Sequence, residues 1–291
     1  VSRMVVFTFY FELMRILFRL FMLAASLLAS VPVLHAQGDA MLTHYWAVPT
    51  YYNPGAAGDT DNIRIRGGLR MQWVGIDNAP RTFVAAAAMP FKFLGKRWGT
   101  GLVVQQESEG LFRNLTVSAQ IGYKFKDLKG EFTGALRLGV FNEQFKGSEV
   151  FIPDDDDYHQ SADDAIPTRD VAGNAFDMGI GVYYVHPRLK AGVSLLHAMS
   201  PTVTFTSEGE NTATPGGGTS ETAKRYQFTA PRTLYFTAEG NIPVRNTLFE
   251  VLPSVLVRSD FTFTDFAVTG RVRYNKMFSA GVGYRYGDAV S

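Results

Sequence analysis

Several segments of this chain alternate apolar and polar residues at every second position over about ten residues. From Leu115 to Phe125, aliphatic and aromatic side chains share one face, while threonine, serine, glutamine, glycine and lysine share the other. The segments 63–72 and 266–274 repeat the pattern with arginines on the polar face. A one-residue slip would move those arginines to the apolar face. Alternation of this length is typical of transmembrane β-strands, in which one face meets lipid and the other water.

The composition agrees with membrane strands and excludes other classes. Hydrophobic residues make up 46% of the 291 residues and charged residues only 19%. A net charge of +1 leaves no basic excess that would attract nucleic acid, so we expect no nucleic-acid partner. The absence of cysteine excludes disulfides, thiolate metal sites and a lipid-bearing cysteine. Any membrane anchor of the mature chain must therefore be the fold itself.

The N-terminal region has the features of an export signal. A basic stretch begins at Met14, an apolar run extends from Leu20 to Leu34, and a small residue follows at Ala36. This order predicts a signal peptide over residues 14–36, with cleavage after Ala36. The alternative is a membrane anchor, but two serines and a proline interrupt the run. Residues 1–13 are interpreted as upstream read-through.

The period-2 pattern predicts eleven strands in an antiparallel, up-and-down transmembrane β-barrel. Their approximate ranges are 62–72, 81–90, 98–107, 113–125, 131–143, 175–186, 188–198, 228–240, 247–258, 265–275 and 277–287.

The connections that follow odd-numbered predicted strands differ in length from those that follow even-numbered ones. If the first strand runs outward, the inner turns are short, around 91–93, 126–130, 186–187, 241–243 and 275–276, and the two longest connections, 144–174 and 199–227, lie outside. Outer-membrane barrels have this asymmetry. We also expect interfacial aromatic residues near both strand ends, among them Phe125, Phe132, Tyr184 and Tyr274. The alternative all-β reading is a soluble, exported β-sandwich that acts as a binding module.

An odd number of strands does not suit a bacterial barrel, because such barrels normally close with an even number. We therefore interpret residues 61–291 as an incomplete barrel, C-terminally truncated from one of about 14 strands. Residues 37–60 would be a periplasmic N-terminal or plug segment.

Four stretches resemble the PorP/SprF family of Bacteroidetes, which belongs to the type IX secretion system. The most specific is Arg70-Met71-Gln72-Trp73-Val74-Gly75, followed by Ala79-Pro80-Arg81-Thr82. The others begin at Asn53-Pro54, at Pro253-Ser254 with Arg258, and at Tyr284-Arg285 with Gly287-Asp288. The matches keep the order of the family and cover most of the mature chain. Members of the family usually continue through further strands beyond the last of these motifs.

The resemblance implies a function without catalysis. It implies an integral outer-membrane barrel, accessory to type IX secretion, that supports the secretion or surface attachment of cargo with C-terminal sorting domains, including adhesins and gliding components. The implied partners are outer-membrane lipid, periplasmic or peptidoglycan-associated secretion components, and that cargo. No cofactor is implied. The alternative function is an outer-membrane diffusion channel, indicated by the arginines on the polar faces.

Two segments are candidates for a plug or a docking surface. Trp73, Asp77, Pro80 and Arg81 lie in the first outer connection, which either folds inward or forms a tight hairpin with an interfacial tryptophan. The aromatic stretch from Tyr45 to Asn53 precedes the first strand, so it either plugs the barrel, contacts periplasmic components or caps the lower rim.

Metal and catalytic sites receive little support. Asp154, Asp155, Asp156 and Asp157 are weak candidates for calcium ligands, because their spacing matches no defined calcium loop. His197 and Ser200 are close neighbours, but no third group completes a hydrolase triad in the sequence. The strand arginines either select anions or pair with inward carboxylates, for which Asp177, Glu239 and Glu250 are candidates.

Overall fold

The computed structural model describes residues 39–59, 61–150, 167, 169–207, 211–213, 219–221, 224–286 and 289–290. The predicted signal peptide, the four aspartates from Asp154 to Asp157, and the motif residues Gly287 and Asp288 lie outside these residues. Within the described part, no helix has both the length and the hydropathy needed to cross a membrane.

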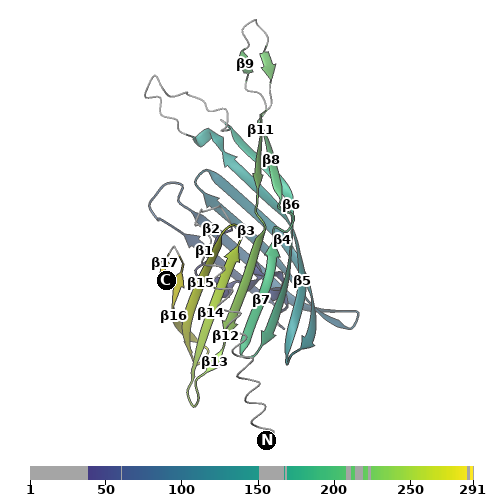
Figure 1. Ribbon diagram of the computed structural model, residues 1–291, viewed down its shortest axis with the longest axis vertical. Helices are drawn as coiled ribbons and strands as arrows, with labels where there is room; N and C mark the ends of the chain where they lie inside the picture. Colours follow the sequence, from purple (N-terminus) through teal and green to yellow (C-terminus); the bar gives the residue numbers. More distant parts are fainter. Residues whose placement is uncertain are drawn as a thin grey trace.

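One large antiparallel sheet contains most of the strands, each paired with its neighbour in the order β1 to β7, β12, β14, β15, β16, β17 (Figure 1). Its strands are β1 (Arg64–Met71), β2 (Arg81–Phe93), β3 (Lys96–Glu109), β4 (Phe112–Asp127), β5 (Gly130–Lys146), β6 (Asp170–His186), β7 (Leu189–Leu196), β12 (Thr233–Gly240), β13 (Ile242–Pro243, paired with β14), β14 (Phe249–Ser259), β15 (Thr264–Tyr274), β16 (Phe278–Arg285) and β17 (Ala289–Val290). Among the described residues, β1 pairs only with β2 and the sheet does not close. The up-and-down antiparallel fold class is confirmed.

The eleven predicted strands all correspond to strands of this sheet, with local differences. β2 extends to Phe93, so the turn predicted at 91–93 lies within a strand and the chain reverses at residues 94–95. The strand predicted at 228–240 is interrupted at residues 230–232, where Pro231 has no N–H to donate to a ladder.

A second small ladder lies within the long connection predicted at 199–227. β11 (Lys224–Thr229) pairs with β8 (Thr202–Ser207), and β9 (Asn211–Ala213) pairs with β10 (Thr219–Glu221). Figure 1 shows β8 and β11 alongside the upper part of the large sheet, where β8 contacts β6, with β9 above them. The connection therefore contains strand structure that the sequence pattern did not predict.

The two ends of the sheet differ in their connections. At one end, here called the turn end, the connections β2–β3, β4–β5 and β6–β7 each contain two residues. At the opposite end, the loop end, β5 and β6 are separated by residues 147–169 and β7 and β12 by residues 197–232. This difference confirms the prediction that the two longest connections lie at the end opposite the short turns.

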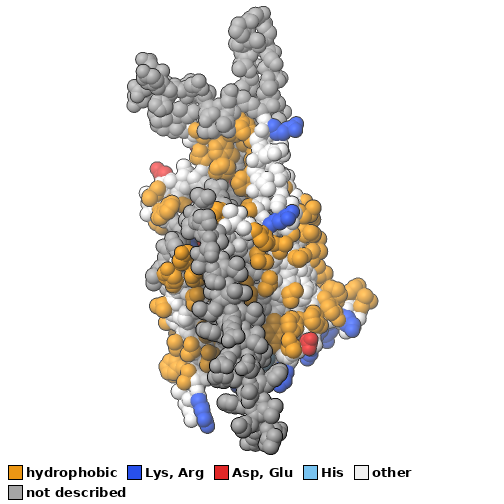
Figure 2. Space-filling model, in the orientation of Figure 1, with side chains coloured by type: hydrophobic (Ala, Val, Ile, Leu, Met, Phe, Trp, Pro, Cys, Tyr) orange, Lys and Arg blue, Asp and Glu red, His pale blue; other side chains and the backbone are white. Residues whose placement is uncertain are grey.

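The two faces of the sheet have the polarity of a membrane barrel. On β4, Leu115, Val117 and Ile121 are 39–46% exposed, whereas Thr116 and Gln120 on the other face are each 2% exposed. Apolar side chains therefore lie outside and polar ones inside, the reverse of a water-soluble sandwich. Figure 2 shows hydrophobic side chains spread over the visible outer surface between the two ends. The soluble β-sandwich alternative is thus wrong.

Aromatic side chains form a row at the turn end. Phe125 stacks on Phe132 with ring centroids 5.5 Å apart, and Phe132 contacts Tyr184 at 4.7 Å. Phe249 and Tyr274 form a similar pair at 4.9 Å. The four aromatics expected near both ends thus all lie at one end, because each is within a few residues of a turn-end connection.

Candidate functional site in the barrel interior

Residues 39–59, here called the inner segment, lie against the polar, concave face of the sheet. The segment contains η1 (Tyr45–Ala47), α2 (Pro49–Tyr52) and η2 (Pro54–Gly58). Prolines start the last two turns, where the missing N–H costs nothing. The Asn53 side chain accepts a 2.8 Å hydrogen bond from the Gly55 N–H and so caps η2.

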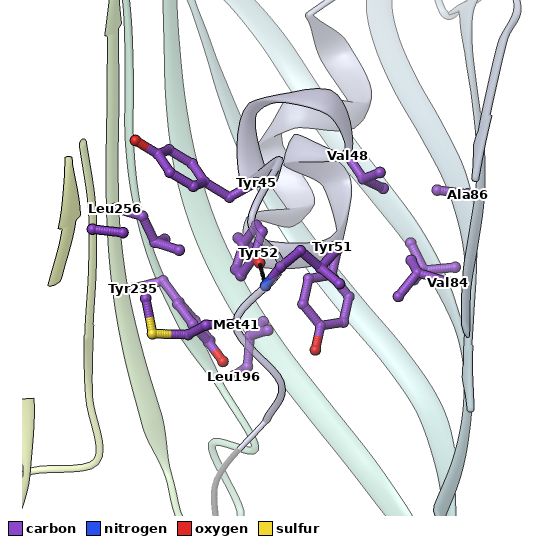
Figure 3. Close-up of a cluster of buried hydrophobic side chains, with 13 residues drawn as sticks. Met41, Tyr45, Val48, Tyr51, Tyr52, Val84, Ala86, Leu196, Tyr235 and Leu256 are labelled. Carbon is purple, nitrogen blue, oxygen red and sulfur yellow. Dashed lines mark hydrogen bonds between the residues drawn. The ribbon is translucent and has the colours of Figure 1, made fainter. Parts of the chain in front are cut away.

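Tyrosines anchor the inner segment in an apolar core inside the sheet (Figure 3). Tyr51 is 2% exposed and Tyr52 is fully buried. The Tyr52 hydroxyl accepts a 2.8 Å hydrogen bond from the Leu42 N–H, so its polar end is satisfied. The core contains Met41, Leu42, Tyr45, Val48, Tyr51 and Tyr52 of the segment and Val84, Ala86, Val103, Leu196, Tyr235, Leu256 and Ala267 of the sheet.

Polar side chains of the sheet satisfy the backbone of α2. Gln120 donates to the Thr50 carbonyl at 2.8 Å, Arg137 to the Tyr51 carbonyl at 3.3 Å, and Ser194 to the Tyr52 carbonyl at 2.5 Å. A single helical turn leaves its carbonyls without intrahelical partners, so these groups would be costly to bury alone. The buried polar residues of β4, β5 and β7 therefore hold the segment in place.

Glycines allow the segment to approach the sheet closely. A Cβ placed on Gly99 of β3 would lie 2.6 Å from the Gly58 Cα, closer than real Cβ contacts. A Cβ on Gly181 of β6 would lie 2.4 Å from the Asn53 Oδ1. Asn53 also donates to the Val182 carbonyl at 3.0 Å. Backbone contact thus explains why Asn53, Pro54 and the small residues that follow occur together.

The start of the segment is held by a buried polar network around Asp39. Its carboxylate lies 3.2 Å from the His197 Nε2 and accepts a 3.0 Å hydrogen bond from the Tyr235 hydroxyl. Arg258 donates to the Asp39 carbonyl. Burial by itself raises the pKa of the Asp39 carboxyl, but attraction to His197 and the hydrogen bonds outweigh it and hold that pKa well below its usual range.

The end of the segment is held by ion pairs near the turn end. The buried Asp59 carboxylate pairs with Lys190 at 2.8 Å and with Arg64 at 3.4 Å. Asp61 pairs with Arg97 and lies 3.6 Å from the Lys124 Nζ. Polar contacts therefore fix both ends of the segment, and the tyrosine core fixes its middle.

Three residues of the later motifs contact the inner segment. Ser254 accepts a 3.0 Å hydrogen bond from the Tyr45 hydroxyl, and Arg258 contacts Asp39 as described above. Arg285 donates to the Met41 carbonyl at 3.1 Å. The neighbouring Pro253 and Tyr284 point to the opposite, outer face, where Tyr284 is 50% exposed.

The first motif divides between the sheet and a loop. Arg70 and Thr82 are direct neighbours across β1 and β2, and Thr82 lies 3.5 Å from the Glu107 carboxylate.

Gln72 donates its N–H to the Pro80 carbonyl, which closes the loop 72–80. Trp73 is 66% exposed in a left-handed backbone conformation (φ 47°), and Gly75 has φ 103°, while Ala79 is buried and Arg81 begins β2. This loop does not fold into the interior, so the inward alternative is wrong for it.

The interior arginines contact carboxylates and the segment. Arg273 pairs with Glu250 at 2.6 Å and Arg271 pairs with Glu239, as expected from the sequence. Arg271 also lies over the Trp46 ring at 4.2 Å from its centroid. These contacts favour filling of the interior over anion selection.

His197 does not form a hydrolase pair with Ser200. Its Nδ1 lies 3.1 Å from the Asp177 carboxylate and its Nε2 faces Asp39, so both ring nitrogens face carboxylates. Asp177 was expected to pair with an arginine, and its observed partner is this histidine. Within the described ranges, no group of three acidic or histidine side chains could hold a metal ion.

Sequence reasoning missed Asp39 and the polar residues that contact the segment. The sequence pattern gives Asp39 no role of its own within 37–60, assigns Gln120 only to the polar face of a strand, and covers Ser194 only by the strand range 188–198. Their type did signal an interior position, but nothing in a period-2 pattern identifies what fills that interior.

Comparison with protein-family models gave a match over residues 34–291 to a family described as "Type IX secretion system membrane protein PorP/SprF". Comparison with curated proteins gave no match. Comparison with solved structures gave none either.

Proposed function

Because this chain belongs to the PorP/SprF family of type IX secretion membrane proteins, located in the outer membrane, we propose that it is an occluded accessory barrel rather than a diffusion channel. The family is one of secretion-system components and not of enzymes. The accessory role is to support the secretion or surface attachment of cargo with C-terminal sorting domains.

The observation that supports this proposal is the inner segment in the interior. Two small cavities of about 50 Å³ each lie beside it, one lined by Asp39 and loop-end residues and the other by Tyr45, Asp59 and turn-end residues. Each has room for a few waters, since one water needs about 10–15 Å³ of such volume. A continuous aqueous path would require displacement of a segment held by its tyrosine core and its polar contacts. We therefore assign residues 39–59 the role of a plug.

We assign the loop end to the cell surface, because outer-membrane barrels carry their longer loops outside. Cargo would then meet the loop 72–80, in which Trp73 and Ile76 are 66% and 61% exposed, together with the connection that contains β8 and β11. The turn end faces the periplasm. Its exposed residues there, including Leu94 and Leu128 at 81% and 73%, are the proposed contacts for periplasmic secretion components.

The partner assignment is tested by extracting the tagged full-length gene product from outer membranes in mild detergent and analysing what co-purifies by mass spectrometry. We expect type IX components and cargo with C-terminal sorting domains. A Trp73→Ala variant should retain the periplasmic components and lose cargo, because it alters only the loop end. Recovery of a heat-modifiable barrel without any of these partners would contradict the proposal.

The channel alternative is tested separately in planar bilayers. The purified full-length protein should show no large, steady conductance, because the inner segment fills the lumen. A stable open current from the unaltered protein would favour the diffusion channel.

A further inference from the structure

The small cavity on the loop-end side of the inner segment has no role in the occlusion described above. Its lining includes the carboxyl groups of Glu107, Glu109 and Glu143 and the amide of Asn114. Aromatic rings of Phe112, Phe141 and Phe228 also line it. The cavity therefore combines carboxyl groups with aromatic rings.

Glu107, Asn114 and Glu143 form a row across three strands. Glu107 of β3 faces Asn114 of β4, and Asn114 faces Glu143 of β5, so all three side chains project from neighbouring positions into the interior. Glu143 is 1% exposed, and its Oε2 has no hydrogen-bond partner among the described residues. The same holds for the Asn114 Oδ1. A buried acceptor without a donor costs on the order of 1–3 kcal/mol, and more when it is charged.

Two cationic groups near Glu143 are engaged elsewhere. His197 lies between Asp39 and Asp177, and Arg137 donates to the Tyr51 carbonyl. Arg70 of β1 interacts electrostatically with Glu107. Among the residues that the structure describes, Glu143 has no ion pair with a lysine or arginine. Glu143 and Asn114 therefore present acceptors for a positively charged donor from outside the described chain.

The aromatic rings restrict the chemistry of that donor. Phe141 stacks on Phe228 with centroids 6.1 Å apart, and Phe112 lies 6.3 Å from Phe228. Phe228 belongs to β11, so the base of the small ladder completes the cavity. Carboxylates beside aromatic rings suit a cation that also has an apolar stem. A bare metal ion would gain nothing from the rings, and the described acidic residues do not group as metal ligands.

We propose that this cavity, named the acidic pocket, binds a primary ammonium or guanidinium group that enters from the loop end. The group donates to Glu143, Glu107 and the Asn114 carbonyl oxygen while its alkyl stem lies along the phenylalanine rings. Either a lysine or arginine side chain of a protein at the cell surface or a free small amine provides this chemistry. The proposal does not depend on the secretion role.

The test uses the full-length protein in detergent and saturation-transfer difference NMR. The probes are Nα-acetyl-lysine amide, Nα-acetyl-arginine amide, putrescine and the uncharged Nα-acetyl-norleucine amide. We expect signals from the cationic probes only, and a Kd at least about tenfold higher in Glu143→Gln, because the charge-assisted hydrogen bond is lost. The matched control is Glu149→Gln, since Glu149 is a loop-end carboxylate outside the acidic pocket that pairs with Lys146. Binding to the control should equal binding to the unaltered protein.

The outcomes separate the two sources and can overturn the proposal. Binding of the lysine or arginine amide supports a protein side chain, and binding of putrescine alone supports a free amine. Equal signals from the norleucine amide, equal affinity in Glu143→Gln, or no binding by any cation would overturn it. Heat-modifiable mobility reports folding of the variant, and Glu107→Gln replaces Glu143→Gln if the latter does not fold. If the co-purification experiment recovers no secretion components, cation binding to the acidic pocket is still expected. The two proposals can therefore fail independently.

Discussion

At the scale of single residues, the inner segment depends on a few buried polar groups that have specific partners. Asp39 is the clearest case, because a histidine, a tyrosine and an arginine all contact it. Removing one partner of a buried charged pair leaves the other charge uncompensated, which typically costs about 3–5 kcal/mol.

Asp39→Asn should therefore destabilise the folded barrel by about 3 kcal/mol. The pKa of Asp39 is lowered by folding, so its ionised form contributes stability that is complete above the unfolded value of 3.8 and is lost as the pH falls below it. The temperature at which the protein unfolds, measured by its heat-modifiable electrophoretic mobility, should drop more between pH 5 and pH 3 for the unaltered protein than for the variant. Parallel pH curves for the two proteins would show that Asp39 is not the titrating group.

Glycine positions give a second test at this scale. Gly99→Ala places a methyl group against Gly58 and should cost about 1–3 kcal/mol through overpacking. Gly68→Ala is the matched control, since a Cβ there meets nothing within 4 Å. Thermal unfolding in detergent compares them, and similar stabilities for both variants would argue against the close packing of the segment on β3.

At the scale of elements, the sheet was predictable from the sequence and the inner segment was not. Alternation over β4 specifies both a strand and its two faces, because the period of a strand is two residues. The turns of the inner segment are too short to produce a period, and Pro49 and Tyr52 acquire their positions from distant strands. The ladder of β8 and β11 was missed because each strand has only six residues, too few for the ten-residue membrane pattern, although Val203 and Phe205 of β8 are buried.

Loosening the inner segment should open the lumen. Tyr52→Ala removes a fully buried ring and should destabilise the segment by about 3–5 kcal/mol, so that proteases cleave between residues 39 and 59 and bilayer conductance appears. Phe176→Ala is the control, because Phe176 is 56% exposed on the outer face. If Tyr52→Ala stays closed and resists proteolysis, the tyrosine core is not what holds the plug.

At the scale of the whole molecule, the outward apolar face requires lipid around it. Val193 of β7 is 48% exposed at mid-strand, so Val193→Arg should cost about 2–4 kcal/mol in the bilayer and reduce the heat-modifiable fraction in outer membranes. Thr202→Arg, at the loop end, should leave that fraction unchanged. Quantitative immunoblotting of unheated and heated membranes measures both, and equal fractions would contradict a lipid contact at β7.

The contacts of the inner segment also impose an order of assembly. Tyr45 bonds to a residue 209 positions later, Arg258 reaches Asp39 across 219 positions, and Arg285 reaches Met41 across 244. Contacts of such sequence separation form late, because the chain between them must first be organised. The part of the described chain that is synthesised first is thus among the last to find its place. Its docking requires β14 and β16 to be in place, so filling of the interior is coupled to strands that are synthesised much later.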